Sequence, residues 1–300
     1  MTRDLLANLA AATAALTAGT VVVVTSVLVH QIQPATLAGM RYSIALIGLV
    51  PVLLFVWPAN RVTAVDVLKV AALGAIFFGI FPWAFTAALS YTTPARGAIG
   101  LATMPIQTLL VAVLLGRERI TGSKIASVIL AFLGVSVVFG PEALEPGGSD
   151  YLKGDFLMLF GVFNSSIYIV LSGATIKKFN ALFVTTFAMG FGVLFLFGVA
   201  FGSGELVTLP AVSREGWLAL LFIGVIGGSI QFVLFIWALG ILSPTRAAIY
   251  LVLTPLSAML LSLVVLHEAI TLALVSGMVL VLSGIYINNH RVATPARSGT

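Results

Sequence analysis

Apolar residues gather into ten blocks along the chain, each bounded by a short polar stretch. A membrane-spanning helix needs roughly 20 mainly apolar residues, because each residue rises about 1.5 Å through a hydrocarbon core about 30 Å thick. The ten blocks meet this requirement. The pattern therefore predicts transmembrane helices near Leu5–Leu28, Thr36–Trp57, Val67–Leu89, Ala95–Leu115, Lys124–Phe139, Gly154–Ile176, Phe183–Phe201, Glu215–Leu239, Thr245–Leu266 and Leu272–Ile287.

Composition supports an all-α integral membrane protein. Sixty percent of the 300 residues are apolar and 8% are charged, whereas soluble domains carry about 25% charged residues. The net charge of +5 does not indicate nucleic-acid binding, because the basic residues are scattered and form no dense patch. The chain has no cysteine, and its three histidines lie far apart, so we expect no metal site and no cofactor.

Basic residues predict the orientation, because short cytoplasmic loops carry an excess of lysine and arginine. A cytoplasmic N-terminus places 11 of the 15 basic residues on the cytoplasmic side. We expect both termini in the cytoplasm of a cell with a plasma (inner) membrane. The basic residues expected on the outer side are Arg41, Arg96, Lys153 and Arg214.

Two halves of the chain match each other at an offset of 150 residues. Between 94–134 and 244–284, 12 of 41 positions are identical, where chance would give roughly a tenth. Five helices per half is an odd number, so the second half must enter the membrane inverted, as in many secondary transporters. We expect a first five-helix repeat at 1–140, an outer linker loop at 141–153, a second repeat at 154–290 and a cytoplasmic tail at 291–300.

The paired stretches resemble a known family. Ala88–Ala95 leads through Pro105 to Glu118, and the second copy repeats this with Pro255 and Glu268. This arrangement is similar to the drug/metabolite transporter superfamily and its EamA-type exporters, and within these most similar to the YddG-type exporters of aromatic amino acids. The resemblance implies ten helices, cytoplasmic termini and a substrate path between the repeats.

Two prolines are the predicted hinges. Pro105 and Pro255 each follow the start of their helix by about 16 Å, roughly half the hydrocarbon core. A proline removes one backbone donor and kinks the helix, and broken helices often border transporter sites. A static packing kink is the alternative.

The predicted substrate site consists of polar and aromatic residues that share helix faces with these prolines or lie on the neighbouring helices. Gln231 needs partners, because an unpaired amide is costly in hydrocarbon. Its alternative role is interhelical hydrogen bonding, and the phenylalanines alone are also typical of ordinary core. The predicted site residues are Phe78, Phe81, Phe85, Thr103, Met104, Gln107, Asn164, Tyr168, Gln231, Phe235, Tyr250 and Thr254.

The sequence predicts that charged residues lie at helix ends. Arg96 and Arg246 are expected to extend to the water interface, with a substrate carboxylate as the alternative partner. No acidic residue is expected in mid-helix, which favours facilitated diffusion over a proton-coupled antiporter. The mid-helix polar residues bind solutes rather than catalyse reactions, so we expect no enzyme.

The sequence predicts an exporter of small organic metabolites, in particular aromatic and other neutral amino acids, working by alternating access. The alternatives are an exporter of another small solute, such as a nucleoside or a drug, and a membrane scaffold protein. The expected partners are a small-molecule substrate and the lipid bilayer, without nucleic acid, and a monomer is compatible with the sequence.

Overall fold

The computed structural model describes residues 3–58, 60–143, 149–206, 212–239, 241–242, 250 and 253–290. These residues form helices joined by short loops and contain no β-strand. Within them, eight helical segments are long and apolar enough to cross a membrane, and two further apolar helices, Leu253–Leu266 and Leu272–Ile287, are shorter. The prediction of an all-helical multi-pass membrane protein is confirmed.

The first half of the chain contains eight helical elements. They are α1 (Arg3–Leu28), α2 (Pro34–Leu54), α3 (Ala64–Gly74), the π-helix η1 (Ala75–Ile80), α4 (Phe81–Ala88), α5 (Pro94–Ala102), α6 (Met104–Leu114) and α7 (Gly122–Ala143). The described elements of the second half are α8 (Ser149–Phe179), α9 (Ala181–Gly202), α10 (Arg214–Gly224), the π-helix η2 (Val225–Ile230), α11 (Gln231–Leu239), α13 (Leu253–Leu266) and α14 (Leu272–His290).

Two helices extend into the stretch 141–153 predicted as a linker, since α7 continues to Ala143 and α8 begins at Ser149. The predicted tail at 291–300 lies outside the described residues, as does the beginning of the predicted helix Thr245–Leu266.

Element bounds recur at the offset of 150 found in the sequence. The helix α3, the π-helix η1 and the start of α4 return as α10, η2 and the start of α11. Glycine contacts between α7 and α14 are reciprocal at the same offset. A Cβ on Gly134 would lie 2.7 Å from the carbonyl oxygen of Gly277, and one on Gly284 would lie 2.8 Å from that of Ser127. Small residues thus let α7 and α14 touch through their backbones.

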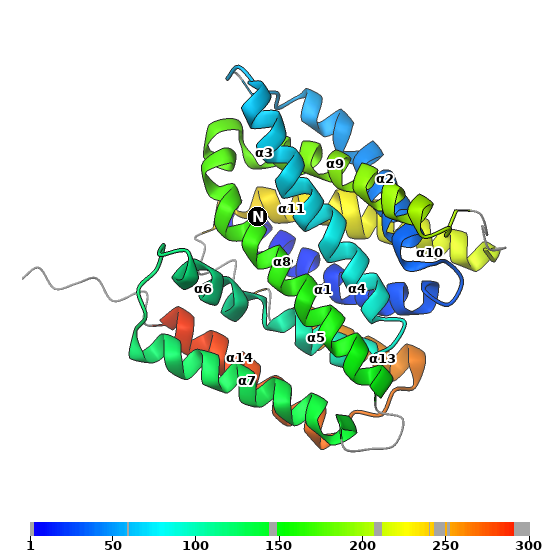
Figure 1. Ribbon diagram of the computed structural model, residues 1–300, viewed down its shortest axis with the longest axis vertical. Coiled ribbons are helices and arrows are strands. Elements are labelled where there is room, and N and C mark those ends of the chain that lie inside the picture. Colours follow the sequence, from blue (N-terminus) through cyan, green and yellow to red (C-terminus); the bar gives the residue numbers. More distant parts are fainter. Residues whose placement is uncertain are drawn as a thin grey trace, which may run out of the picture.

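The first helix of each half packs against the other half. Helix α1 contacts α11 and α13, and α8 contacts α4 and α6. Figure 1 shows α8 running beside α4, and α7 beside α14 along one side of the bundle. A buried cluster that includes Tyr42, Phe78 and Met189 joins α2, η1 and α9. Contacts between the two halves therefore build the centre of the molecule.

A break interrupts the fourth span, as predicted from its proline. Thr103 separates α5 from α6, and Pro105 is the second residue of α6. The Thr103 amide donates to the Gly100 carbonyl at 3.1 Å, which tightens the turn before the break. In the second copy Pro255 is buried and is the third residue of α13. Residues 251–252, which precede α13, lie outside the described residues. The hinge function of both prolines stays a prediction.

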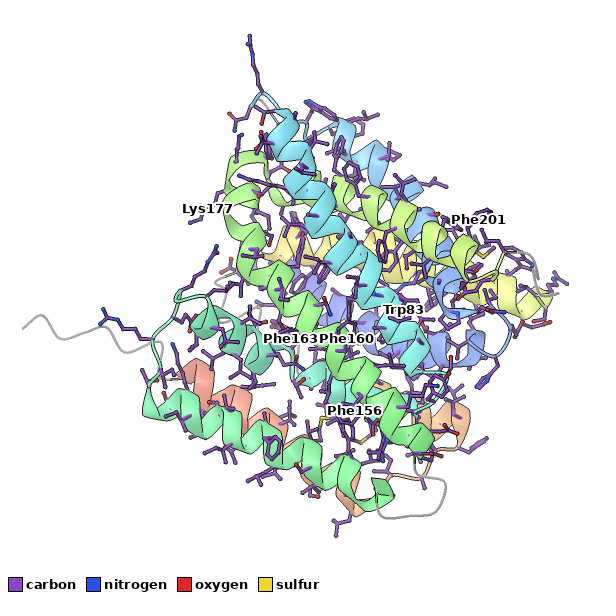
Figure 2. The ribbon with its side chains drawn as sticks, in the orientation of Figure 1. Trp83, Phe156, Phe160, Phe163, Lys177 and Phe201 are labelled. Carbon is purple, nitrogen blue, oxygen red and sulfur yellow. The ribbon has the colours of Figure 1, made fainter. Side chains whose placement is uncertain are left out.

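The outer surface of the bundle is apolar. Large side chains on α8 are exposed, among them Phe156 at 68% and Phe160 at 48%, and Phe201 at the end of α9 is 77% exposed. Figure 2 shows Phe156, Phe160 and Phe163 following one another along α8. Such a surface is unfavourable in water and favourable against lipid tails, which agrees with a membrane-embedded bundle.

Candidate substrate site

The two π-helices mark the centre of the bundle. A π-helical turn is rare and occurs often at functional sites, because it interrupts the regular hydrogen-bond ladder. Here η1 and η2 occupy matching places in the third and eighth spans. Phe77 and Phe78 project from η1, and Phe232 follows η2 on α11. The contact between Phe78 and Phe232 therefore brings η1 next to the start of α11, directly after η2.

Five aromatic rings from four elements meet in this region, and we call them the central aromatic cluster: Tyr42, Phe77, Phe78, Tyr168 and Phe232. The Tyr168 ring of α8 stacks on Phe77 with a centroid distance of 4.4 Å. The Phe78 ring meets the Tyr42 ring edge-on, with a centroid distance of 5.6 Å. Its centroid lies 5.9 Å from that of the tilted Phe232 ring. Phe78 is 1% exposed, whereas Phe77 and Phe232 are half-buried. The cluster offers aromatic faces to an apolar or aromatic solute.

A hollow of about 330 Å³ adjoins the cluster. Leu182 of α9 and Val233 of α11 line it, and both also pack against the buried core that contains Phe78. The rest of its lining comes from Val56, Asn180, Ala181, Ile236 and Trp237. These residues place the hollow at the bundle end predicted to be cytoplasmic.

Three buried polar atoms have no hydrogen-bond partner in the described part of the chain: Thr25 Oγ1, Arg41 Nε and Gln231 Oε1. Gln231 begins α11 immediately after η2, and Arg41 of α2 donates from Nη2 to the Gly227 carbonyl of η2 at 3.4 Å. Unsatisfied buried polar groups cost free energy and are uncommon in folded proteins. Two of the three thus border η2, beside the cluster.

Some predicted site residues lie in the cluster or next to it. Phe78 and Tyr168 belong to the cluster, and Phe81 continues it with a ring distance of 5.7 Å from Phe77. Phe85 lies 6.0 Å beyond Phe81, in a neighbouring buried core. Phe235 lies half-buried on α11, one turn after Gln231.

Other predicted site residues take part in hydrogen bonds within a helical stretch or between helices. The Gln107 amide donates to the Thr103 hydroxyl at 2.9 Å, and Ser166 of α8 donates to the Met104 carbonyl at 3.5 Å. The Asn164 amide donates to the Phe160 carbonyl of its own helix at 2.8 Å. These bonds brace the helix break at Thr103 and the adjoining stretch of α8.

In the second half, Tyr250 and Thr254 connect to α1. The Tyr250 hydroxyl donates to Asn8 at 3.0 Å, and the Thr254 hydroxyl donates to the Ala15 carbonyl at 3.1 Å. Both predicted site residues therefore hold the region of α13 against the first helix of the chain.

A second polar region surrounds Arg96, and we call Thr92, Arg96, Asp155 and Glu268 the Arg96 cluster. Arg96 is 4% exposed and forms an ion pair with Asp155 of α8, which is 1% exposed. Its Nη1 donates to the Val138 carbonyl of α7 at 3.0 Å, and the Thr92 hydroxyl donates to Asp155 at 2.8 Å. The pair is therefore well satisfied inside the bundle.

Glu268 in the loop between α13 and α14 completes this region. Burial raises the pKa of its carboxyl group, opposed by hydrogen bonds with Thr93 and with the backbone of Ala95 and by the charge of Arg96. Glu118, its counterpart at the offset of 150, instead pairs with Lys124 at 2.7 Å on an exposed surface.

Two expectations about charges are wrong. Arg96 does not extend to the interface, because neighbouring helices cover its side chain. Asp155 is an acidic residue buried inside a helix, where none was expected. Arg246 lies outside the described residues.

Four residues of the central region were missed, namely Arg41, Tyr42, Phe77 and Phe232. Arg41 had a visible signal, because it is a charged residue inside an otherwise apolar span. Phe77 precedes Phe81 by one helical turn, and this spacing was also visible. Tyr42 and Phe232 had no comparable signal.

Comparison with known proteins identifies the family. The model of the EamA-like transporter family matches twice, at residues 5–140 and 152–289. An uncharacterized transporter of Archaeoglobus fulgidus is 26% identical over 266 residues, covering 86% of this chain and 90% of the relative. The uncharacterized transporter YoaV of Bacillus subtilis is 23% identical over 263 residues, covering 87% and 88%.

The fold also matches a solved structure, titled only as the crystal structure of a protein. Its TM-score is 0.63 at 19% identity, covering 96% of this chain and 99% of the other. The apolar helices, the two family matches and the transporters among its relatives agree. The chain belongs to the EamA-like transporter family and is a membrane transporter.

Proposed function

We propose that the protein exports small organic metabolites, in particular aromatic and other neutral amino acids. The observation that carries this proposal is the central aromatic cluster, which joins α2, η1, α8 and α11 inside the bundle. Aromatic rings bind other rings through stacked and edge-on contacts, and the neighbouring polar atoms of Arg41 and Gln231 can bind the polar end of such a solute.

Alternating access requires two halves that move against each other, and we propose that these are inverted repeats. The double family match, the recurring element bounds and the reciprocal glycine contacts support this arrangement. The hinges are Pro105, where the helix is interrupted at Thr103, and Pro255, its counterpart at the offset of 150. Movement at these points opens the site to one side at a time.

Transport is proposed to be facilitated diffusion. Asp155 is the buried acid that argues for proton coupling, yet Arg96 and Thr92 already bind both of its oxygens. Because its oxygens already have partners within the protein, we assign Asp155 a structural role in holding α8 against α5. We place the protein as a monomer in the inner membrane, with both termini cytoplasmic.

Counterflow in proteoliposomes tests this proposal. Vesicles loaded with unlabelled phenylalanine should accumulate labelled phenylalanine and tryptophan without a proton gradient, and should do so faster than alanine or uridine. Tyr168→Ala should reduce this flux, because it removes the ring stacked on Phe77. Leu194→Ala on α9, which replaces a side chain 70% exposed on the surface, is the matched control.

The outcomes separate the alternatives. Flux of uridine or a drug alone would replace the substrate and keep the transporter, and flux only with an imposed proton gradient would establish an antiporter. If no solute moves through a folded protein, the proposed export function is contradicted and the scaffold alternative gains support.

A further inference from the structure

Arg41 is the most unusual charged residue of the described chain. It lies seven residues into α2, and its side chain is enclosed by neighbouring helices, with 8% of the residue exposed. Arginine stays protonated in proteins, so a full positive charge is present inside the bundle. A buried charge is costly unless an opposite charge compensates it.

The contacts of Arg41 leave this charge uncompensated. Its Nη2 reaches the Gly227 carbonyl at 3.4 Å, a long bond, and its guanidinium lies 5.0 Å from the Tyr42 ring centroid. Its Nε has no partner, and no carboxylate of the described residues lies within 4 Å. Nε and Nη2 form one edge of the guanidinium, and such an edge can bind both oxygens of a carboxylate.

This edge lies beside the central aromatic cluster. Tyr42, which carries the cation–π contact, also touches Phe78 at 5.6 Å. Gln231 lies one helical turn after Gly227, on the same side of the helix. Its unpaired Oε1 is an acceptor, as an ammonium group requires.

We propose that Arg41 binds the carboxylate of the transported solute, while Gln231 Oε1 accepts from its ammonium group and the aromatic cluster holds its side chain. The inference rests on the proposed function and specifies its substrate class as α-amino acids or related carboxylates. The solute supplies the opposite charge that α2 lacks, which explains why an uncompensated arginine is present beside the cluster.

An analogue series tests the proposal by competition against labelled phenylalanine in the counterflow assay. 3-Phenylpropionate keeps the carboxylate and lacks the ammonium, whereas phenethylamine and phenylalaninamide lack the carboxylate. A hydrogen-bonded charge is worth about 1.5–3 kcal/mol, which corresponds to a loss of roughly 10- to 150-fold. The two analogues without carboxylate should therefore compete at least about tenfold less well than phenylalanine, and 3-phenylpropionate should lose less.

Variants connect this preference to the residue. Arg41→Gln should remove the preference for carboxylates, and Arg41→Lys should restore part of it, because lysine keeps the charge without the two-pronged geometry. Arg214→Gln, at an exposed position, is the matched control and should behave as the wild type. Size-exclusion profiles and thermal unfolding show whether each variant is folded. If Arg41→Gln does not fold, the analogue competition series on the wild-type protein decides whether a carboxylate is required.

The results distinguish this inference from the proposed function. Equal competition by phenylalanine and phenylalaninamide on the wild type would overturn the role of Arg41 while aromatic export stands. Selective flux of non-aromatic carboxylates, lost in Arg41→Gln, would support Arg41 and overturn the aromatic substrate. If no carboxylate in the series competes or moves, both proposals are overturned.

Discussion

Among the described residues, two arginines lie buried in the bundle, and their surroundings differ. Arg96 forms an ion pair with Asp155 and donates to the Val138 carbonyl, so its charge is compensated by the protein itself. Arg41 has one long hydrogen bond, one aromatic contact and no carboxylate among the described residues. A compensated charge fixes helices in place, whereas an uncompensated one beside an aromatic cluster suits a ligand that arrives and leaves.

The largest expected loss of stability follows from breaking the ion pair of the Arg96 cluster. Arg96→Met leaves Asp155 buried without its cation, which should lower the free energy of unfolding by about 3–5 kcal/mol. Unfolding by SDS titration in mixed micelles measures this change. The double variant Arg96→Met/Asp155→Leu should recover most of the loss, and a double variant as unstable as the single one would show that the ion pair is not what stabilises this region.

The close contact between α7 and α14 supports the surroundings of Arg96 and can be tested separately. Gly134→Ala places a methyl group against the Gly277 carbonyl and pushes apart α7 and α14, where α7 supplies the Val138 carbonyl to Arg96. We expect a loss of about 1–3 kcal/mol in the same titration. Gly173→Ala is the control, because no atom lies within 4 Å of its added Cβ. A loss of equal size in both variants would argue against the close helix contact.

Replacing Arg41 should not lower the free energy of unfolding, in contrast to replacing Arg96. Arg41→Met removes an unsatisfied buried donor, worth about 1–3 kcal/mol, and also a cation–π contact worth about 0.5–1 kcal/mol. The free energy of unfolding without solute should therefore stay unchanged or rise by up to about 2 kcal/mol. A loss like that of Arg96→Met would break the comparison and make Arg41 a structural residue.

The smallest expected effect is the pH dependence of stability that Glu268 causes. Because the pKa of Glu268 is raised in the folded protein, the unfolded chain loses this proton first as the pH rises. Its contribution to stability is therefore fully present below the ordinary carboxyl pKa of 4.5 and is lost as the pH rises through the folded value. Thermal unfolding across this window should show that decline in the wild type and in Glu118→Gln, and a weaker one in Glu268→Gln. Identical profiles for all three would contradict the burial of Glu268.

Sequence reasoning predicted the features that depend on local pattern. The apolar blocks correspond to the helices, and the helix break occurs next to Pro105, because proline acts on its own backbone. The surroundings of Arg41, Arg96 and Asp155 were missed, because a position near a helix end does not reveal which helices cover it. Asp155 is 59 residues from Arg96 in the chain, and only the packing of α5 against α8 brings them together.

Part of the candidate site was also predictable from the local sequence pattern. Phe78 and Tyr168 lie in the aromatic cluster, since large residues in mid-span are buried where helices meet. The π-helices were not predicted, because their backbone pattern follows from tertiary packing. Gln107 and Asn164 were expected in the site, yet each bonds within its own stretch of helix, a choice that residue type alone does not determine.

The most direct test of the account is to locate a bound aromatic amino acid in an experimental structure, using 4-iodophenylalanine so that the iodine marks the ring. The account predicts the carboxylate on the Nε and Nη2 edge of Arg41 and the iodinated ring against Phe78 and Tyr168. A ligand bound elsewhere, for example in the groove beside Asp155 between α7 and α8, or no bound ligand at saturating concentration, would contradict it.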